Sequence, residues 1–199
     1  MKYIWIVFLS CILGLVACAP SANAVNTAIA QTQTALPLPT PTAPFSAIDL
    51  EPLLIQVVDF LPPNYSGVQF VKSLPSKYES LNIPVADYMI RQDIERDRYS
   101  SGFVTILLYE SQDSLEEAYY KLFSDKGESK PLDGVGRKGQ IFSSSLAVPP
   151  VVLKWVELLF VQCGALVDIS LTGTDNEQDV ITYAEPLARS LEVDPFVCR

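Results

Sequence analysis

The stretch VVLKWVELLFVQCGALVDISLTG, residues 151–173, decides the fold of this chain. Apolar residues alternate with other residues on both sides of Cys163-Gly164, which is the pattern of β-strands that bury one face. The sequence therefore predicts a β-hairpin that turns at Cys163-Gly164. The alternating apolar positions are Val156, Leu158 and Phe160 in the first arm and Val167, Ile169 and Leu171 in the second.

A helix is expected directly after this hairpin. The segment TDNEQDVITYAEPLARSLEV, residues 174–193, changes to the helical spacing of apolar residues. We expect Asp175 and Gln178 to cap a helix over residues 175–191, and Pro186 to bend it because proline removes one backbone hydrogen bond. The expected buried stripe is Val180, Ala184, Leu187, Ala188 and Leu191.

The same plan occurs earlier in the chain. Residues 88–108 read as a hairpin with its turn at Ser100–Gly102, and residues 111–127 read as a helix that Gly127 ends. Asp113 and Glu116 have the spacing of a capping box. The apolar positions of this unit are Tyr88, Ile90, Ile94, Val104, Ile106 and Leu108 in the strands and Leu115, Ala118, Tyr119, Leu122 and Phe123 in the helix.

These two hairpin–helix units predict an α+β fold. Their strands would form one antiparallel sheet, and their helices would cover its hydrophobic face or faces. An additional N-terminal helix is expected from Leu50 to Leu61, capped by Ser46 and ended by Pro62-Pro63. Together these elements predict a single domain over residues 48–199.

The first 17 residues read as a signal peptide. One basic residue, Lys2, is followed by an apolar run over residues 3–16, which is shorter than the roughly 20 residues that a spanning helix needs. The run ends in Leu15-Val16-Ala17-Cys18, which resembles the lipobox of bacterial lipoproteins. The resemblance implies cleavage after residues 1–17 and a diacylglycerol on Cys18. The alternative is an uncleaved anchor with an incidental cysteine.

Residues 18–47 read as a tether that would follow the lipid. They are rich in Ala, Thr and Pro, and from Ala19 onward they carry no charge. Proline favours the extended polyproline II conformation, so we expect a spacer that lifts the domain off the bilayer. A proline-rich ligand for a partner is the other interpretation. Both place the domain on the extracytoplasmic side of a cell membrane.

Export makes a disulfide the expected state of the two remaining cysteines, Cys163 and Cys198. The strand after Cys163 would climb about 26 Å and the last helix would return about 25 Å, which brings Cys198 back to the hairpin turn. The bond would close a loop of about 36 residues and contribute roughly 3–4 kcal/mol. Two free buried thiols are the alternative.

Composition excludes several classes of function. The chain carries 14 basic and 23 acidic residues, a net charge of −9, so we expect no nucleic-acid partner. It contains no histidine, which removes the commonest general base and metal ligand. We therefore predict no catalytic residue, no metal ligand and no cofactor.

Three motifs have a plain structural interpretation beside a functional one. The run GVGRKG, residues 134–139, matches G-x-G-x-x-G, but the sequence after it reads as a strand, so a turn is expected rather than a phosphate site. Glu116 and Glu117 point in different directions on a solvated helix face instead of forming a catalytic pair. The acidic residues Asp175, Glu177 and Asp179 suit the start of a helix better than a calcium loop.

The order of these elements resembles the PknH-like extracellular sensor domain and LpqN-like lipoproteins. The matching segments are LLIQVVDFLPPNY, LLYESQDSLEEAYYKLF, GVGRKG and LLFVQCGALVDISLTG with the final helix. The resemblance implies an extracytoplasmic binding or sensing module.

We therefore expect a non-enzymatic, lipid-anchored module that binds a small ligand, a wall component or an envelope protein. Tyr99, Tyr109 and Tyr120 are candidate contact residues. Two alternatives stay open: a carboxylate-dependent hydrolase of envelope glycans, which needs two carboxylates about 5–10 Å apart, and an accessory subunit of an envelope complex.

Overall fold

The computed structural model describes residues 48–63, 65–71, 76–97 and 100–198. They lie within one compact unit, Ala43–Arg199, built on a seven-stranded sheet with the strand order β1-β2-β3-β7-β6-β5-β4. All neighbouring strands are antiparallel. The strands are β1 Ser66–Val71, β2 Tyr88–Asp97, β3 Ser100–Leu108, β4 Lys130–Pro131, β5 Lys138–Val148, β6 Val151–Gln162 and β7 Ala165–Thr172.

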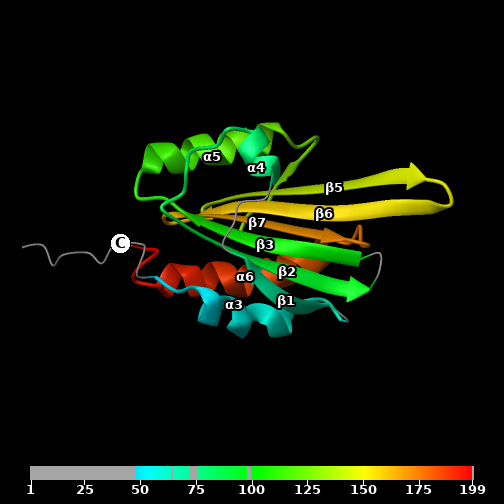
Figure 1. Ribbon diagram of the computed structural model, residues 1–199, viewed down its shortest axis with the longest axis horizontal. Coiled ribbons are helices and arrows are strands. Elements are labelled where there is room, and N and C mark those ends of the chain that lie inside the picture. The colour runs from blue at the N-terminus through cyan, green and yellow to red at the C-terminus, as the bar shows by residue number, and fades with distance from the viewer. Residues whose placement is uncertain (1–47, 64, 72–75, 98–99, 199) are drawn as a thin grey trace, which may run out of the picture. The chain divides into compact units, whose positions relative to one another are not determined.

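Helices cover both faces of this sheet (Figure 1). One face packs on α3 and α6, and the other packs on α4 and α5. The α+β fold with two hairpin–helix units and an N-terminal helix is thus confirmed. The helices are α3 Glu51–Val57, the 3₁₀ turn η2 Val58–Phe60, α4 Ser76–Ser80, α5 Gln112–Ser124 and α6 Glu177–Val193.

Alternation along the central strands supplies two separate cores. In β6, Val156, Leu158 and Phe160 face α6, whereas Leu159 and Val161 face α5. The first seven residues of β7 are all buried, so both faces of this central strand are covered. This agrees with the mainly apolar sequence of the strand. The turn between β6 and β7 is at Cys163-Gly164, as predicted.

The helix caps differ from the expected ones by one or two residues. Ser111 caps α5 by accepting from the Ser114 N–H, and Asn176 caps α6 by accepting from the Gln178 N–H. A capping residue must have non-helical backbone angles, and both of these are extended. Asp113 instead lies inside the first turn of α5. Helix α6 runs unbroken through Pro186.

Two further expectations about the N-terminal half need correction. The first helix is shorter than predicted because α3 ends at Val57 and continues only as η2, while Ser46 lies outside the described residues. Gly102 is not in a turn but inside β3, where it pairs with both β2 and β7. A Cβ atom there would lie 2.2 Å from the Ser170 carbonyl oxygen. Glycine at this position therefore allows β3 and β7 to approach each other closely.

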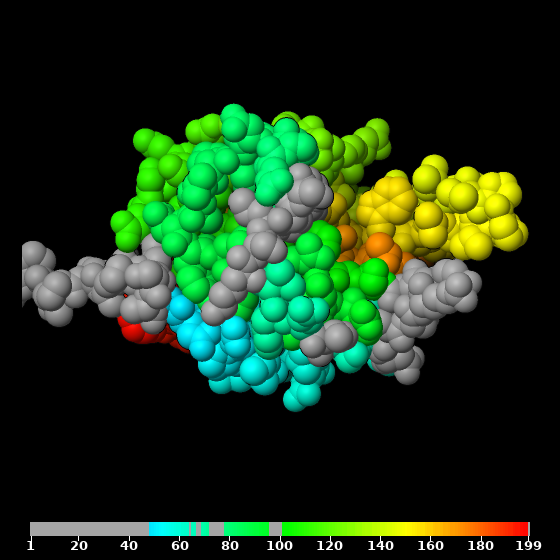
Figure 2. All heavy atoms as spheres, viewed as in Figure 1, coloured from blue at the N-terminus to red at the C-terminus, as the bar shows by residue number. Residues whose placement is uncertain are grey.

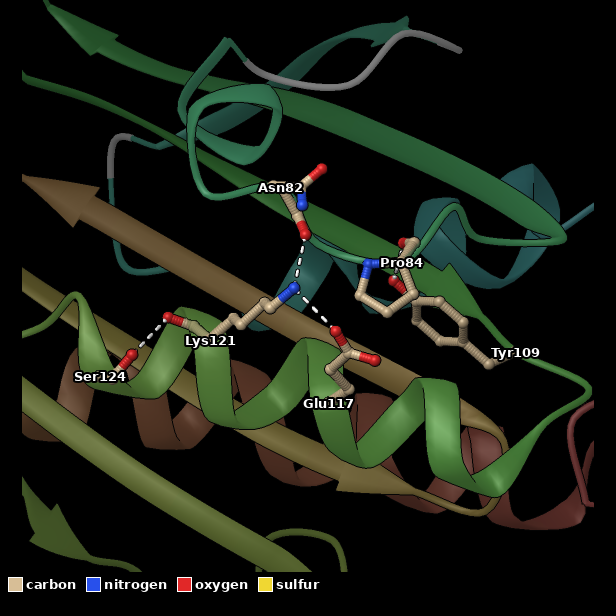
Figure 3. A network of polar contacts seen from close by, with 6 residues as sticks. All are labelled: Asn82, Pro84, Tyr109, Glu117, Lys121 and Ser124. Atoms are coloured by element: carbon tan, nitrogen blue, oxygen red, sulfur yellow. Dashed lines mark hydrogen bonds and ion pairs between the residues drawn. The ribbon is translucent and has the colours of Figure 1, made fainter.

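Helix α5 is tied to the segment before β2 by polar contacts (Figure 3). The Lys121 Nζ donates to the Asn82 carbonyl at 2.7 Å and pairs with Glu117 at 2.7 Å. On the same side, the Tyr109 hydroxyl donates to the Pro84 carbonyl at 3.0 Å. These contacts fix the position of α5 relative to the sheet.

Candidate binding site at the β5–β6 hairpin

The hairpin of β5 and β6 extends beyond the rest of the sheet (Figure 1). Its strands pair as far as Val148 and Val151, on either side of Pro149-Pro150. Strand β7 pairs with β6 only from Trp155 onward, and β4 pairs with β5 only at Gln140 and Ile141. The outer part is therefore a two-stranded ribbon, which stands clear of the body in yellow in Figure 2.

One face of this ribbon is apolar and exposed. By strand alternation it is the face that continues from Phe142 in the α5-side core. We call it the apolar stripe, and it consists of Leu146, Val148, Val151 and Leu153. These four side chains are between 43% and 53% exposed, although the same residue types are usually buried. Clustered exposed apolar residues mark interaction surfaces.

A cleft of about 450 Å³ lies where the ribbon meets the body of the domain. We call it the foot cleft. Strands β5 and β6 line one side of it, and the end of α5 with the following loop lines the other. The lining residues are Leu81, Leu122, Asp125, Lys126, Gly127, Glu128, Phe142, Ser143, Ser144, Trp155 and Glu157. Trp155 occupies the same ribbon face as the apolar stripe, so stripe and cleft form one continuous surface.

A buried charge cluster forms the floor of the foot cleft. The Lys126 ammonium pairs with Glu157 and lies 3.5 Å from the Asp168 carboxylate. Asp168 is 2% exposed and also accepts a 2.6 Å hydrogen bond from the Tyr78 hydroxyl. Burial, followed by the negative charge of Asp168, raises the pKa of Tyr78. Tyr78 therefore stays protonated and keeps donating to Asp168.

This cluster holds both carboxylates against one lysine. The Lys126 Nζ also lies 5.4 Å from the centre of the Phe142 ring, which helps to fix it beneath the cleft. Buried ion pairs of this kind define geometry because separating them leaves an uncompensated charge. The floor of the cleft therefore consists of interlocked charged groups, and its exposed polar groups lie at the rim.

A larger hollow of about 640 Å³ lies at the opposite end of the sheet, beside the disulfide. Its charged lining residues are Arg137, Glu185, Arg189 and Glu192, and all four are exposed. None of its lining residues is a large exposed apolar side chain, whereas the foot cleft adjoins the four exposed side chains of the apolar stripe. We therefore place the candidate site at the hairpin, in spite of the larger volume here.

The glycine run lies in a turn between β4 and β5. Gly136 has a φ of +64°, and a Cβ atom there would lie 2.5 Å from the Val161 carbonyl oxygen. Strand β5 begins within the run at Lys138, so the run does not lead into a helix as a phosphate-binding loop does. The run makes a tight turn against β6.

The disulfide joins Cys163 and Cys198 with a Cα–Cα distance of 5.1 Å. It ties the C-terminal end of the chain to the β6–β7 turn, and Cys163 has a left-handed φ of 52°. Cys18 lies outside the described residues.

Of the three candidate tyrosines, the structure describes Tyr109 and Tyr120. Tyr99 lies outside the described residues, and Tyr109 is 3% exposed with its hydroxyl bonded to Pro84. Tyr120 is 55% exposed and packs edge-on against Tyr119. Neither Tyr109 nor Tyr120 lines the foot cleft.

The acidic side chains singled out by sequence have separate partners. Asp175 pairs with Lys154 at 2.7 Å, and this contact lowers the pKa of Asp175. Glu177 pairs with Lys130 at 2.8 Å, and that hydrogen bond lowers the pKa of Glu177. Asp179 accepts from Thr174 and Asn176. Among the described residues, no group of three acidic, cysteine or histidine side chains could hold a metal ion.

The hairpin surface was missed by the sequence reasoning, although the chain contained a signal for it. Residues 139–153 form a run of 15 without any charge, in a protein that is otherwise acidic. Its centre, LAVPPVVL, has apolar residues on both sides of a proline pair, where a solvated turn would be polar.

No family model matches this chain, and no curated protein matches its sequence. Among solved structures, the extracellular domain of PknH from Mycobacterium tuberculosis is similar with a TM-score of 0.42 and 8% identity. That alignment covers 76% of this chain and 97% of the PknH domain. Within the described part of the chain, no helix is long and apolar enough to cross a membrane.

Proposed function

We propose that this chain is a lipid-anchored extracytoplasmic module that binds a partner without catalysis, and that it does so through the apolar stripe and the foot cleft. The observation that carries the proposal is the row of four exposed apolar side chains on a projecting ribbon, next to a cleft with an aromatic wall. Exposing such an apolar surface to water costs free energy, so its burial against a partner is favourable.

The cysteines support an extracytoplasmic location. A disulfide such as Cys163–Cys198 persists in oxidising compartments outside the cytosol. The lipobox-like sequence that ends at Cys18 supports the anchor. Two acyl chains on one cysteine give stable attachment to a membrane.

The position of the stripe supports recognition away from the anchor. The described chain begins beside Tyr88, whose hydroxyl lies 3.3 Å from the Leu50 N–H. Tyr88 pairs with Leu108, and Leu108 pairs with Ala165, so this is the disulfide end of the sheet. Strand β6 carries the chain about 36 Å from the hairpin tip to that end. The described part of the chain therefore begins at the end of the sheet opposite the stripe.

The charge cluster makes Glu157 and Asp168 unsuited to act as a hydrolytic pair. Glycoside hydrolysis needs two carboxylates that face the substrate. Here Glu157 and Asp168 are both paired with Lys126, and Asp168 is also held by Tyr78.

Two measurements test the proposal. Mass spectrometry of the native protein would show whether the mature chain begins at an acylated Cys18. Capture of partners from native membranes would then compare Leu153→Lys with Val152→Lys. Val152 lies at the same level of the ribbon but on its other face, and it is 56% exposed. We expect Leu153→Lys to lose the captured partner and Val152→Lys to keep it. Equal capture by both variants would refute the stripe as the binding surface.

A further inference from the structure

The outer edge of β5 has free backbone groups along the ribbon. In an antiparallel strand, the N–H and C=O groups of alternate residues point to the same neighbour. The Gly139 carbonyl points outward, because it accepts from the Leu132 N–H at 3.0 Å. By alternation the backbone groups of Ser143, Ser145 and Ala147 also point outward, beyond the end of β4. Among the described residues, none of these groups has a backbone partner.

This edge lacks the devices that usually prevent strand addition. Natural edge strands carry charges, prolines or bulges that block pairing with another chain. Between Phe142 and Val148, β5 has no charge and no proline, and its register with β6 is unbroken. The opposite edge strand β1 differs, because its pairing with β2 is shifted between Gly67 and Gln69.

The side chains around the edge indicate the chemistry of a partner strand. A strand added to β5 would place alternate side chains beside the apolar stripe, so apolar residues are favoured at every second position. Its end would reach the foot cleft, where Asp125 and Glu128 are exposed. Neither carboxylate forms an ion pair with another described residue. Basic side chains at that end would complement them.

Two other occupants fit this surface less well. A second copy would bring another chain of net charge −9 against the acidic rim and supply no excess of basic groups. A lipid bilayer would cover the stripe but leave the outward N–H and C=O groups of β5 without partners in hydrocarbon, which is costly.

We propose that the free edge of β5 binds an extended polypeptide segment as an additional antiparallel strand, with apolar residues at alternate positions and basic residues at its C-terminal end. The antiparallel direction continues the pattern of the sheet, and it brings the C-terminal end of the segment to Asp125 and Glu128. This inference rests on the proposed function of the stripe and the foot cleft, and it specifies the partner.

The test uses the mature chain that begins at acylated Cys18, held in phosphatidylcholine nanodiscs, because cleavage after residue 17 removes Trp5. Trp155 is then the only tryptophan and reports directly on the foot cleft. The probe is the blocked, fluorescein-labelled peptide TVTVTVKK, and the reference peptide is TVTVTVEE. We expect TVTVTVKK to raise fluorescence anisotropy and to shift the Trp155 emission. Its affinity should be about tenfold higher than that of TVTVTVEE, because charge pairs at two acidic groups are lost in the reference.

Ser145→Pro and Ser145→Ala form the matched pair of variants. Proline removes an outward N–H, whereas alanine removes only the hydroxyl, so Ser145→Pro should bind about tenfold more weakly and Ser145→Ala as the parent does. The double variant Asp125→Lys and Glu128→Lys keeps the edge and reverses the rim charge. It should prefer TVTVTVEE, which keeps the test decisive if Ser145→Pro fails to fold.

Each alternative result would overturn strand addition in a recognisable way. Concentration-dependent dimers that Ser145→Pro dissociates, without peptide binding, would assign the edge to a second copy. Shielding of Trp155 by the nanodisc itself, unaffected by peptide, would assign it to lipid. Failure of both peptides while Leu153→Lys still loses the partner captured from membranes would refute strand addition and leave the proposed function standing.

Discussion

Replacing Lys126 by methionine tests how the floor of the foot cleft is held together. The Lys126 side chain is 8% exposed, and its ammonium is paired with both Glu157 and Asp168, whose side chains are 13% and 2% exposed. Methionine keeps the length and the apolar stem of lysine but removes the charge. The variant therefore leaves Asp168 buried with no cation beside it, and only the Tyr78 hydroxyl still donates to it.

The expected cost follows from the burial of Asp168. Removing one partner of a buried ion pair costs about 3–5 kcal/mol, because an uncompensated charge remains in the interior. With a urea dependence of about 1–3 kcal/mol per molar, the midpoint of unfolding should fall by about 2 M. Lys121→Met is the matched control, since Lys121 is half-buried and pairs with an exposed glutamate. That exposed i,i+4 pair contributes only about 0.3–0.5 kcal/mol, and the Lys121 hydrogen bond to the Asn82 carbonyl adds about 1 kcal/mol, so Lys121→Met should cost clearly less than Lys126→Met.

The pH dependence of Lys126→Met provides a second, independent readout. Burial without a cation favours the neutral carboxyl, so the folded variant binds a proton more readily than the unfolded chain, in which an Asp titrates near pH 3.9. The folded state then binds more protons than the unfolded state, and its stability must fall as pH rises. The deficit relative to the parent should therefore be largest at pH 7 and shrink toward pH 4.

Urea unfolding of the parent and both variants, followed by circular dichroism between pH 4 and pH 8, measures both effects. Adding Asp168→Asn to Lys126→Met should recover part of the lost stability at pH 7, because it removes the unpaired charge. A loss below about 1 kcal/mol at pH 7, or a deficit independent of pH, would refute the buried cluster as described.

Three further predictions concern the fold. Replacing both Cys163 and Cys198 by serine should lower the free energy of unfolding by roughly 3–4 kcal/mol, measured in urea, and an unchanged value after thiol reduction would contradict this. Gly102→Ala should destabilise the domain by more than about 3 kcal/mol because its Cβ would collide with a β7 carbonyl, while Gly127→Ala, with nothing within 4 Å, should be nearly neutral in thermal melts. Burial raises the pKa of Tyr183, so the stability from keeping it protonated is present below about pH 10 and lost as pH rises further. Absorbance titration should show that Tyr183 ionises only together with unfolding, and early ionisation of every tyrosine would contradict its burial.

Local periodicity was sufficient to predict the elements with strong patterns. The alternation of Val156, Leu158 and Phe160 identified β6, and the stripe from Leu115 to Leu122 identified α5. Such patterns are readable because side chains repeat every two residues in a strand and every 3.6 in a helix. Ends of elements were less predictable, since Ser111 and Asp113 are both good capping residues and only the backbone angles select between them.

The sequence by itself determined which faces are apolar, which segments form hairpins and helices, and where the two cysteines meet, because these follow from spacing along one chain. Only the tertiary structure decided that Lys126 lies buried between Glu157 and Asp168, since charged residues far apart in sequence look alike whether exposed or paired. It likewise decided that the ends of β4 and β7 leave the outer part of the β5–β6 hairpin uncovered. Whether part of a strand is covered depends on where its neighbouring strands end. Those ends are set by pairing between residues far apart in the sequence, which the periodicity of a single strand does not show.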